Sequence, residues 1–177
     1  MAVQMVPTLV VRGIIQGFDY GYEPSIDGIQ YDGKLKLSSY GAQMDWRPPL
    51  VPLYVTAGIF ANDNHYSLSV TPTGNVEIGN KIYTPAQVGT LSSKAKFDDV
   101  AYFLGAGLKL DLGPLETALE AGVYSQGKPI VDYSASGSLA SNPTFQADLA
   151  LEKEKMSQEL KPHQYWPMIT LFARWKF

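Results

Sequence analysis

The chain has 177 residues and no cysteine. Disulfide bonds and thiolate-ligated metal sites are therefore excluded. A chain without thiols suits a protein that is exported and must stay unfolded in transit. The net charge is only −3, which gives no reason to expect a nucleic-acid partner.

Long apolar runs are also missing, although hydrophobic residues make up 45% of the chain. No stretch approaches the ~18 consecutive apolar residues that indicate a membrane-spanning helix. Residues 1–7 lack the basic region, apolar core and cleavage site of a signal peptide. Either a signal was removed and Met1 added, or the start of the gene is missing. At this length we expect a single domain, residues 1–177.

The segment from Tyr165 to Phe177 carries the strongest pattern in the chain. A β-strand sends alternate side chains to opposite faces. The odd positions of this segment are all apolar, with aromatics at both ends, whereas the even positions end in Arg174 and Lys176. Lipid on one side and a polar lumen on the other explain both faces, as in a strand of a transmembrane β-barrel with aromatics at the interfaces.

Six segments have the pattern of membrane strands. They are residues 8–20, 31–46, 53–62, 101–112, 115–126 and 165–177. Short turns and long connections alternate between them, which is typical of barrels with short periplasmic turns and longer extracellular loops. This alternation places the C-terminus in the periplasm. It places on the extracellular side a small hairpin around Gly79-Asn80 and one helix, within residues 141–160.

Two local features are also predicted. In residues 31–46 the apolar positions change from odd to even, which predicts a β-bulge near Ser38 and Ser39. In the helix, the charged run from Glu152 to Lys155 predicts a solvated face.

Six strands are fewer than the eight of the smallest known outer-membrane barrels. Open strand edges are not tolerated in lipid. Two more strands before Met1, two copies sharing one larger barrel, or a partner subunit covering the edges would each solve this problem. We therefore expect an all-β, transmembrane, antiparallel up-and-down barrel of the eight-stranded type, with about six membrane strands in this chain and one short extracellular helix.

The alternation assigns side chains to the two faces of the barrel wall. The charges predicted to point into the lumen are Arg12, Lys109, Glu116, Glu120, Arg174 and Lys176, with Asp111 near a turn. The lipid-facing side chains are predicted to include Leu104, Leu108, Leu110, Leu119, Ile169 and Leu171. The charges indicate either an ion path or a salt-bridged plug. The plug is favoured because side chains fill the lumen of so small a barrel and buried charges need partners.

Several short stretches resemble a family of small Gram-negative outer-membrane proteins. They are residues 31–37, 45–48, 71–74, 83–92 and 145–149, together with the ending on Trp175 and Phe177. The family looks like eight-stranded barrels of the OmpA/OmpW type, whose members usually carry a signal peptide and an extra N-terminal hairpin that this chain lacks. The resemblance implies a location in the outer membrane and a C-terminal signal that the barrel-insertion machinery reads. It implies no established activity and therefore no functional residue.

Other function classes are weaker. His65 and His163, the only histidines, have no serine or carboxylate at a recognisable motif spacing, so an outer-membrane lipid-modifying enzyme is disfavoured. Asp63 fits an ordinary turn better than a calcium loop. A soluble lipocalin-like barrel that binds a small ligand would expose the aliphatic faces to water. We expect a structural, accessory or narrow porin-like barrel without cofactor or metal. Its expected partners are membrane lipid, lipopolysaccharide, the insertion machinery and, if edges stay open, another subunit.

Overall fold

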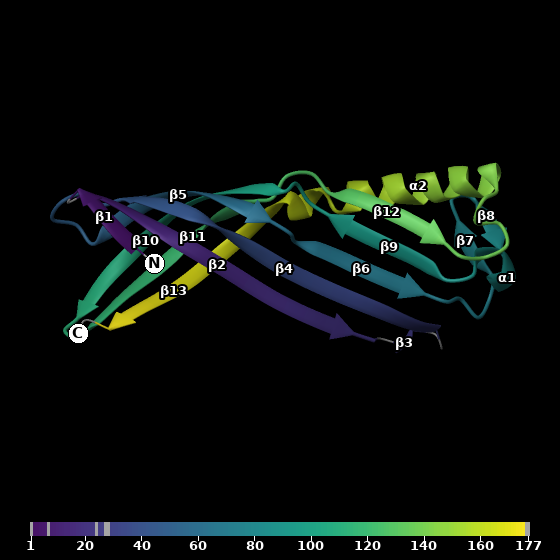
Figure 1. The fold of residues 1–177 in the computed structure, drawn as a ribbon, viewed down its shortest axis with the longest axis horizontal. Helices are drawn as coiled ribbons and strands as arrows, with labels where there is room; N and C mark the ends of the chain where they lie inside the picture. Colours follow the sequence, from purple (N-terminus) through teal and green to yellow (C-terminus); the bar gives the residue numbers. More distant parts are fainter. Residues whose placement is uncertain (1, 7, 24, 27–28, 176–177) are drawn as a thin grey trace.

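The computed structural model of the chain describes residues 2–6, 8–23, 25–26 and 29–175. It is dominated by one antiparallel sheet of eleven strands (Figure 1). The sheet divides into a barrel wall at one end of the long axis and a second part, here called the cap, at the other. None of the described helices is long and apolar enough to span a bilayer.

The barrel wall is a meander in which strands that follow one another pair antiparallel. Its order is β1 (Ala2–Val6), β2 (Leu9–Tyr22), β4 (Ile29–Trp46), β5 (Leu53–Asn62), β10 (Val100–Leu112), β11 (Leu115–Ser125) and β13 (Tyr165–Trp175). The six long strands are those predicted from the alternating pattern. The short strand β1 was not predicted, because residues 2–6 were compared only with a signal peptide.

The cap continues the same sheet beyond the barrel. It contains β6 (His65–Val70), β9 (Leu91–Lys96) and β12 (Ile130–Ala135), and the short strand β3 (Ser25–Ile26) pairs with β4. A separate hairpin of β7 (Val76–Ile78) and β8 (Lys81–Tyr83), the short helix α1 (Pro85–Val88), α2 (Pro143–Glu159) and the 3-10 turn η1 (Lys161–Gln164) complete it. The hairpin around Gly79 is therefore confirmed.

No β-bulge interrupts β4, so the prediction at Ser38 and Ser39 was wrong. The register of β4 against β2 is continuous from Trp46 to Gly33, and its register against β5 and β6 is also unbroken. The hydrophobic pattern changes because the surroundings change. In the barrel the odd positions of β4 face a polar lumen, whereas in the cap the odd positions, such as Leu35, face α2 across a groove.

Helix α2 begins where its cap and its proline predict. Asn142 accepts hydrogen bonds from the backbone N–H groups of Thr144 and Phe145 at 2.9 and 3.2 Å, and Pro143 occupies the first turn. Phe145 and Leu149 are buried against β7, β8 and α1, in a small core that also contains Ile78, Tyr83 and Val88. This core fixes the first half of α2 over the cap sheet.

The two ends of the meander do not pair with each other in the described residues. β13 has a ladder with β11, and β1 has a ladder with β2, but no ladder joins β13 to β1 or β2. Side chains from these ends nevertheless meet across the lumen, since the Arg12 guanidinium on β2 lies 4.6 Å from the centre of the Phe172 ring on β13. The wall is therefore curled around a common interior.

Candidate functional site

The interior of the barrel holds a charge network centred on Arg12. Its guanidinium donates to Asp45 Oδ1 at 2.8 Å and to Glu120 Oε2 at 2.5 Å. The Tyr54 hydroxyl donates to the same Glu120 oxygen at 2.9 Å. Asp45 and Glu120 are buried, so four strands, β2, β4, β5 and β11, are tied together across the lumen.

The network is balanced in charge. Arg47 donates to the second oxygen of Asp45 at 2.9 Å and lies over the Tyr54 ring at 5.5 Å. Two guanidinium groups thus face two carboxylates, and each carboxylate also has a neutral or cationic donor. Buried charges are stable only when they are paired and hydrogen-bonded in this way.

A second ion pair lies close to the β10–β11 turn. Lys109 Nζ is 3.1 Å from Glu116 Oε1. Asp111 and Arg174 lie opposite Glu116 on the neighbouring strands, by backbone register. The side chain of Arg174 and all of Lys176 fall outside the described residues. Of the six predicted lumen charges, the structure therefore brings Arg12 together with Glu120, and Lys109 with Glu116.

The predicted charge network did not include Asp45, Arg47 or Tyr54. The signal for Asp45 was present, because the residues on either side of it, Met44 and Trp46, are apolar and belong on the outer face, which turns Asp45 inward. Arg47 had no such signal, since it lies in the connection 47–52, outside the alternating pattern. Its side chain turns back toward Asp45 at the end of the lumen.

An aromatic layer fills the lumen on the cap side of this network. Phe60, Phe103 and Tyr124 are buried together, with Trp166 and Met168 packed against them. Glycines make room for the rings: a Cβ at Gly105 or Gly122 would lie within 2.8 Å of the Phe103 ring, and one at Gly107 within 2.2 Å of Tyr54. The rings and the charge network therefore lie at successive levels of the barrel interior.

The outer face of the wall is aliphatic. Ile169 is 81% exposed and Leu171 73% exposed, whereas Glu120 on the other face is 1% exposed. Among the other predicted lipid-facing residues, Leu104, Leu110 and Leu119 are exposed and Leu108 is half-buried. A lipocalin-like barrel requires the opposite arrangement, with aliphatic side chains enclosed and charges outside.

The two histidines lie near the junction of barrel and cap. His65 Nδ1 is 3.1 Å from the backbone oxygen of Asp63 and 3.5 Å from a carboxylate oxygen of the same residue. His163 contributes its backbone oxygen, which accepts hydrogen bonds from Gln126 and Trp166. Asp63 itself pairs with Lys36 at 2.8 Å, as expected for a turn at a strand end.

Two charged side chains of α2 form hydrogen bonds with the backbone of the β7–β8 turn. Glu152 accepts from the Gly79 N–H at 3.0 Å, and Lys155 donates to the Gly79 oxygen at 3.1 Å. Gly79 has a φ of 67°, which a residue with a side chain rarely adopts. The predicted solvated face is confirmed for Lys153, Glu154 and Lys155, which are exposed, whereas Glu152 is half-buried at this turn. Lys153 also pairs with Asp132 at 3.3 Å.

A polar cluster secures the same hairpin. The Tyr83 hydroxyl donates to Asp148 Oδ2, and Lys81 donates to that oxygen at 3.0 Å. The hydrogen bond from Tyr83, followed by the one from Lys81, lowers the pKa of Asp148 below its ordinary value. The same bond raises the pKa of the Tyr83 hydroxyl.

Acid is expected to loosen this hairpin from α2. Because the pKa of Asp148 is lower in the folded chain than in the unfolded chain, the stabilisation is present above the ordinary pKa of about 3.9 and is lost as the pH falls through the folded value. Hydrogen exchange of residues 76–83, corrected for intrinsic rates, should accelerate in that range. In the variant Asp148→Asn exchange should be faster at neutral pH and should lose this acid dependence, whereas the same acid step in that variant would contradict the assignment.

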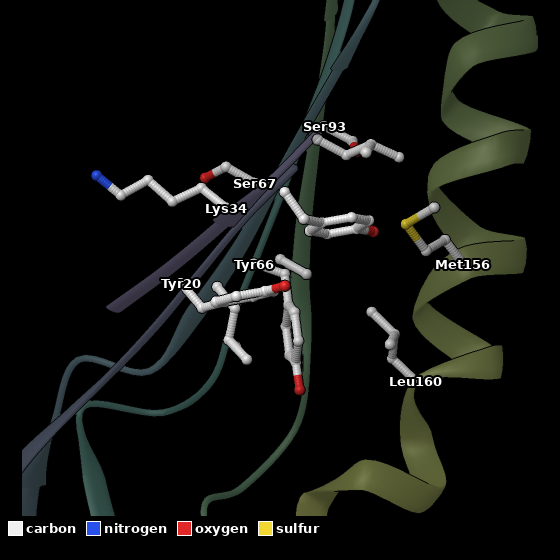
Figure 2. Close-up of a pocket in the computed structure, with 11 residues that line it drawn as sticks. Tyr20, Lys34, Tyr66, Ser67, Ser93, Met156 and Leu160 are labelled. Atoms are coloured by element: carbon white, nitrogen blue, oxygen red, sulfur yellow. The ribbon is translucent and has the colours of Figure 1, made fainter. Parts of the chain in front are cut away.

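A groove separates the second half of α2 from the cap sheet. It has a volume of about 420 Å³ and is lined by Tyr20, Tyr22, Lys34, Leu35, Tyr66, Ser67, Leu68, Ser93, Ala95, Met156 and Leu160. Figure 2 shows Met156 and Leu160 reaching from α2 toward the strands, while Lys34 extends from the opposite side of the sheet.

An antiparallel meander with charges inside and aliphatic side chains outside has the architecture of an outer-membrane β-barrel. Two crystal structures of outer-membrane proteins of this kind, CarO and CarO2 of Acinetobacter baumannii, share the fold. CarO matches with a TM-score of 0.56 at 20% identity, and CarO2 with 0.59 at 21%; each match covers 99% of this chain and 90% of the other. The predicted fold class is confirmed by this likeness. No protein-family model and no curated relative matches the sequence.

Proposed function

We propose that the protein is an outer-membrane barrel with a closed lumen that presents a structured cap to the outside of the cell. The observation that carries this proposal is the Arg12 network, because it joins strands from opposite sides of the barrel across the space that a pore would need. The described wall has seven strands, and side chains already fill a barrel of eight. In this proposal the barrel anchors the cap in the membrane and does not act as a channel.

The orientation follows from the lengths of the connections. The connections from β5 to β10 and from β11 to β13 at the cap end are long and structured, whereas 47–52 and 113–114 at the other end are short. β13 runs away from the cap and ends at the opposite end of the molecule (Figure 1). Since long connections of such barrels are extracellular, the cap faces outward and the C-terminus faces the periplasm. Lipid, lipopolysaccharide and the insertion machinery are the partners that this placement implies.

The proposal does not give either histidine a catalytic role. It also differs from a narrow porin in a measurable way, because a porin of any width conducts ions.

Planar-bilayer recording tests the proposal. The wild-type chain, inserted from detergent, is expected to show no resolved single-channel current. The charged side chains around Arg12 are held in ion pairs, and the aromatic layer lies between them and the cap. Protease protection of the same preparation in vesicles, with heat-modifiable migration, confirms that silence comes from folded and inserted protein. A reproducible current from the wild-type chain would contradict closure and favour the narrow porin.

A further inference from the structure

The groove of the cap has features of a binding site that packing alone does not explain. On β2, Phe18, Tyr20 and Tyr22 form a stacked row with ring centroids 6.2 and 6.4 Å apart. These rings are on the same strand face as Arg12, so they continue the inner wall of the barrel into the cap. Tyr20 remains 55% exposed because the main contacts of α2 with strands are with β12 and β7 and not with β2.

The opposite wall of the groove is supplied by the last turns of α2. Phe145 and Leu149 pack the first half of the helix into the small core. Met156 and Leu160 lie beyond that core and face β6 and β9 across the groove. The Tyr133 hydroxyl contacts Met156 Sδ at 3.5 Å and fixes that side chain. A thioether facing aromatic rings is a favourable neighbour for another flat ring.

The lining is neutral. Lys34 is the one charged residue among the side chains that line the described groove, and it extends away from α2 (Figure 2). Burial raises the pKa of the Tyr66 hydroxyl, so this group stays protonated at neutral pH. A charged ligand would therefore lose water without gaining a partner, whereas a neutral one would meet rings and hydroxyl groups.

The volume of the groove favours a small molecule over a protein partner. A volume of about 420 Å³ lies within the ~300–1,000 Å³ of typical small-ligand pockets. A helix about 10 Å across would not enter without displacing α2.

We propose that the groove between α2 and the cap sheet binds a neutral, planar aromatic molecule of two or three rings, which packs on Tyr20 and Tyr66 and is covered by Met156 and Leu160. The hydroxyl groups of the lining offer hydrogen bonds to a polar substituent of the ligand. This site lies outside the barrel lumen, so it does not depend on whether the lumen conducts.

The test uses 2-naphthol as a neutral probe and naphthalene-2-sulfonate as its anionic counterpart. The full chain is placed in lipid nanodiscs, and calorimetric titration is corrected with empty nanodiscs. The wild type should bind 2-naphthol saturably and should bind the sulfonate at least tenfold more weakly. Tyr20→Ala should weaken 2-naphthol binding about three- to tenfold, as expected for one lost aromatic contact. Leu160→Glu should weaken it further by placing a charge in the groove.

Tyr40→Ala is the matched control, because Tyr40 is a tyrosine on the outer face of the barrel and is 65% exposed, against 55% for Tyr20. Its binding should equal that of the wild type, and all variants must keep heat-modifiable migration. The proposal is overturned by binding no greater than in empty nanodiscs, by equal binding of the two probes, or by equal effects of Tyr20→Ala and Tyr40→Ala. Self-association that Tyr20→Ala abolishes would also overturn it, since a second copy would then occupy the groove.

Discussion

Replacing Arg12 with alanine is expected to lower the free energy of unfolding by about 3–5 kcal/mol, because it leaves Asp45 and Glu120 buried with their principal cationic partner removed. Arg12 is the member of the network that touches both carboxylates. Urea titration of the protein folded into lipid vesicles, followed by tryptophan fluorescence, measures the change.

Two further variants separate charge pairing from general packing. Arg12→Lys keeps the charge but loses the guanidinium fork that reaches two partners, so its loss should be smaller. The combined variant Arg12→Met, Asp45→Leu, Arg47→Met, Tyr54→Phe, Glu120→Leu removes the whole network together. It should recover much of the stability lost in Arg12→Ala, since apolar groups of similar volume replace buried ion pairs at little cost. A loss below about 1 kcal/mol in Arg12→Ala would show that water reaches the network and screens it.

A cation placed on the aliphatic outer face should be the second large effect. Ile169 lies in the middle of β13 and is 81% exposed. If this face meets acyl chains, Ile169→Arg should cost about 2–4 kcal/mol in the same vesicle titration, as expected near a bilayer midplane. Leu112→Arg, beside the β10–β11 turn, should cost only about 0–1 kcal/mol, because arginine there reaches the interface.

Ile82→Arg provides the matched control for this experiment. Ile82 is 72% exposed but lies on β8 in the cap, which we place in water. Its substitution should stay within about 0.5 kcal/mol, as for ordinary surface changes. Equal effects at Ile169 and Ile82 would mean that both side chains face the same solvent, which would contradict the assignment of the outer face to the lipid.

The sequence alone determined the six long strands of the barrel wall. Strict alternation fixes which side chains share a face, so the six long strands, the exposed faces around Leu104 and Leu171, and the inward position of Arg12 and Glu120 followed from residue order. The position of α2 followed in the same way from a proline and a capping residue at its start.

The tertiary structure alone decided which partners meet. Alternation gives a face but no neighbour across the lumen, so the sequence did not reveal that Arg12 on β2 binds Glu120, which lies 108 residues away on β11. Nor did it show that Arg47 turns back from its loop to Asp45, or that Glu152 and Lys155 hold Gly79. The same limit produced the false bulge at Ser38 and Ser39. One strand there passes from a polar lumen to an apolar groove, and only the arrangement of β2, β6 and α2 in space shows where its surroundings change.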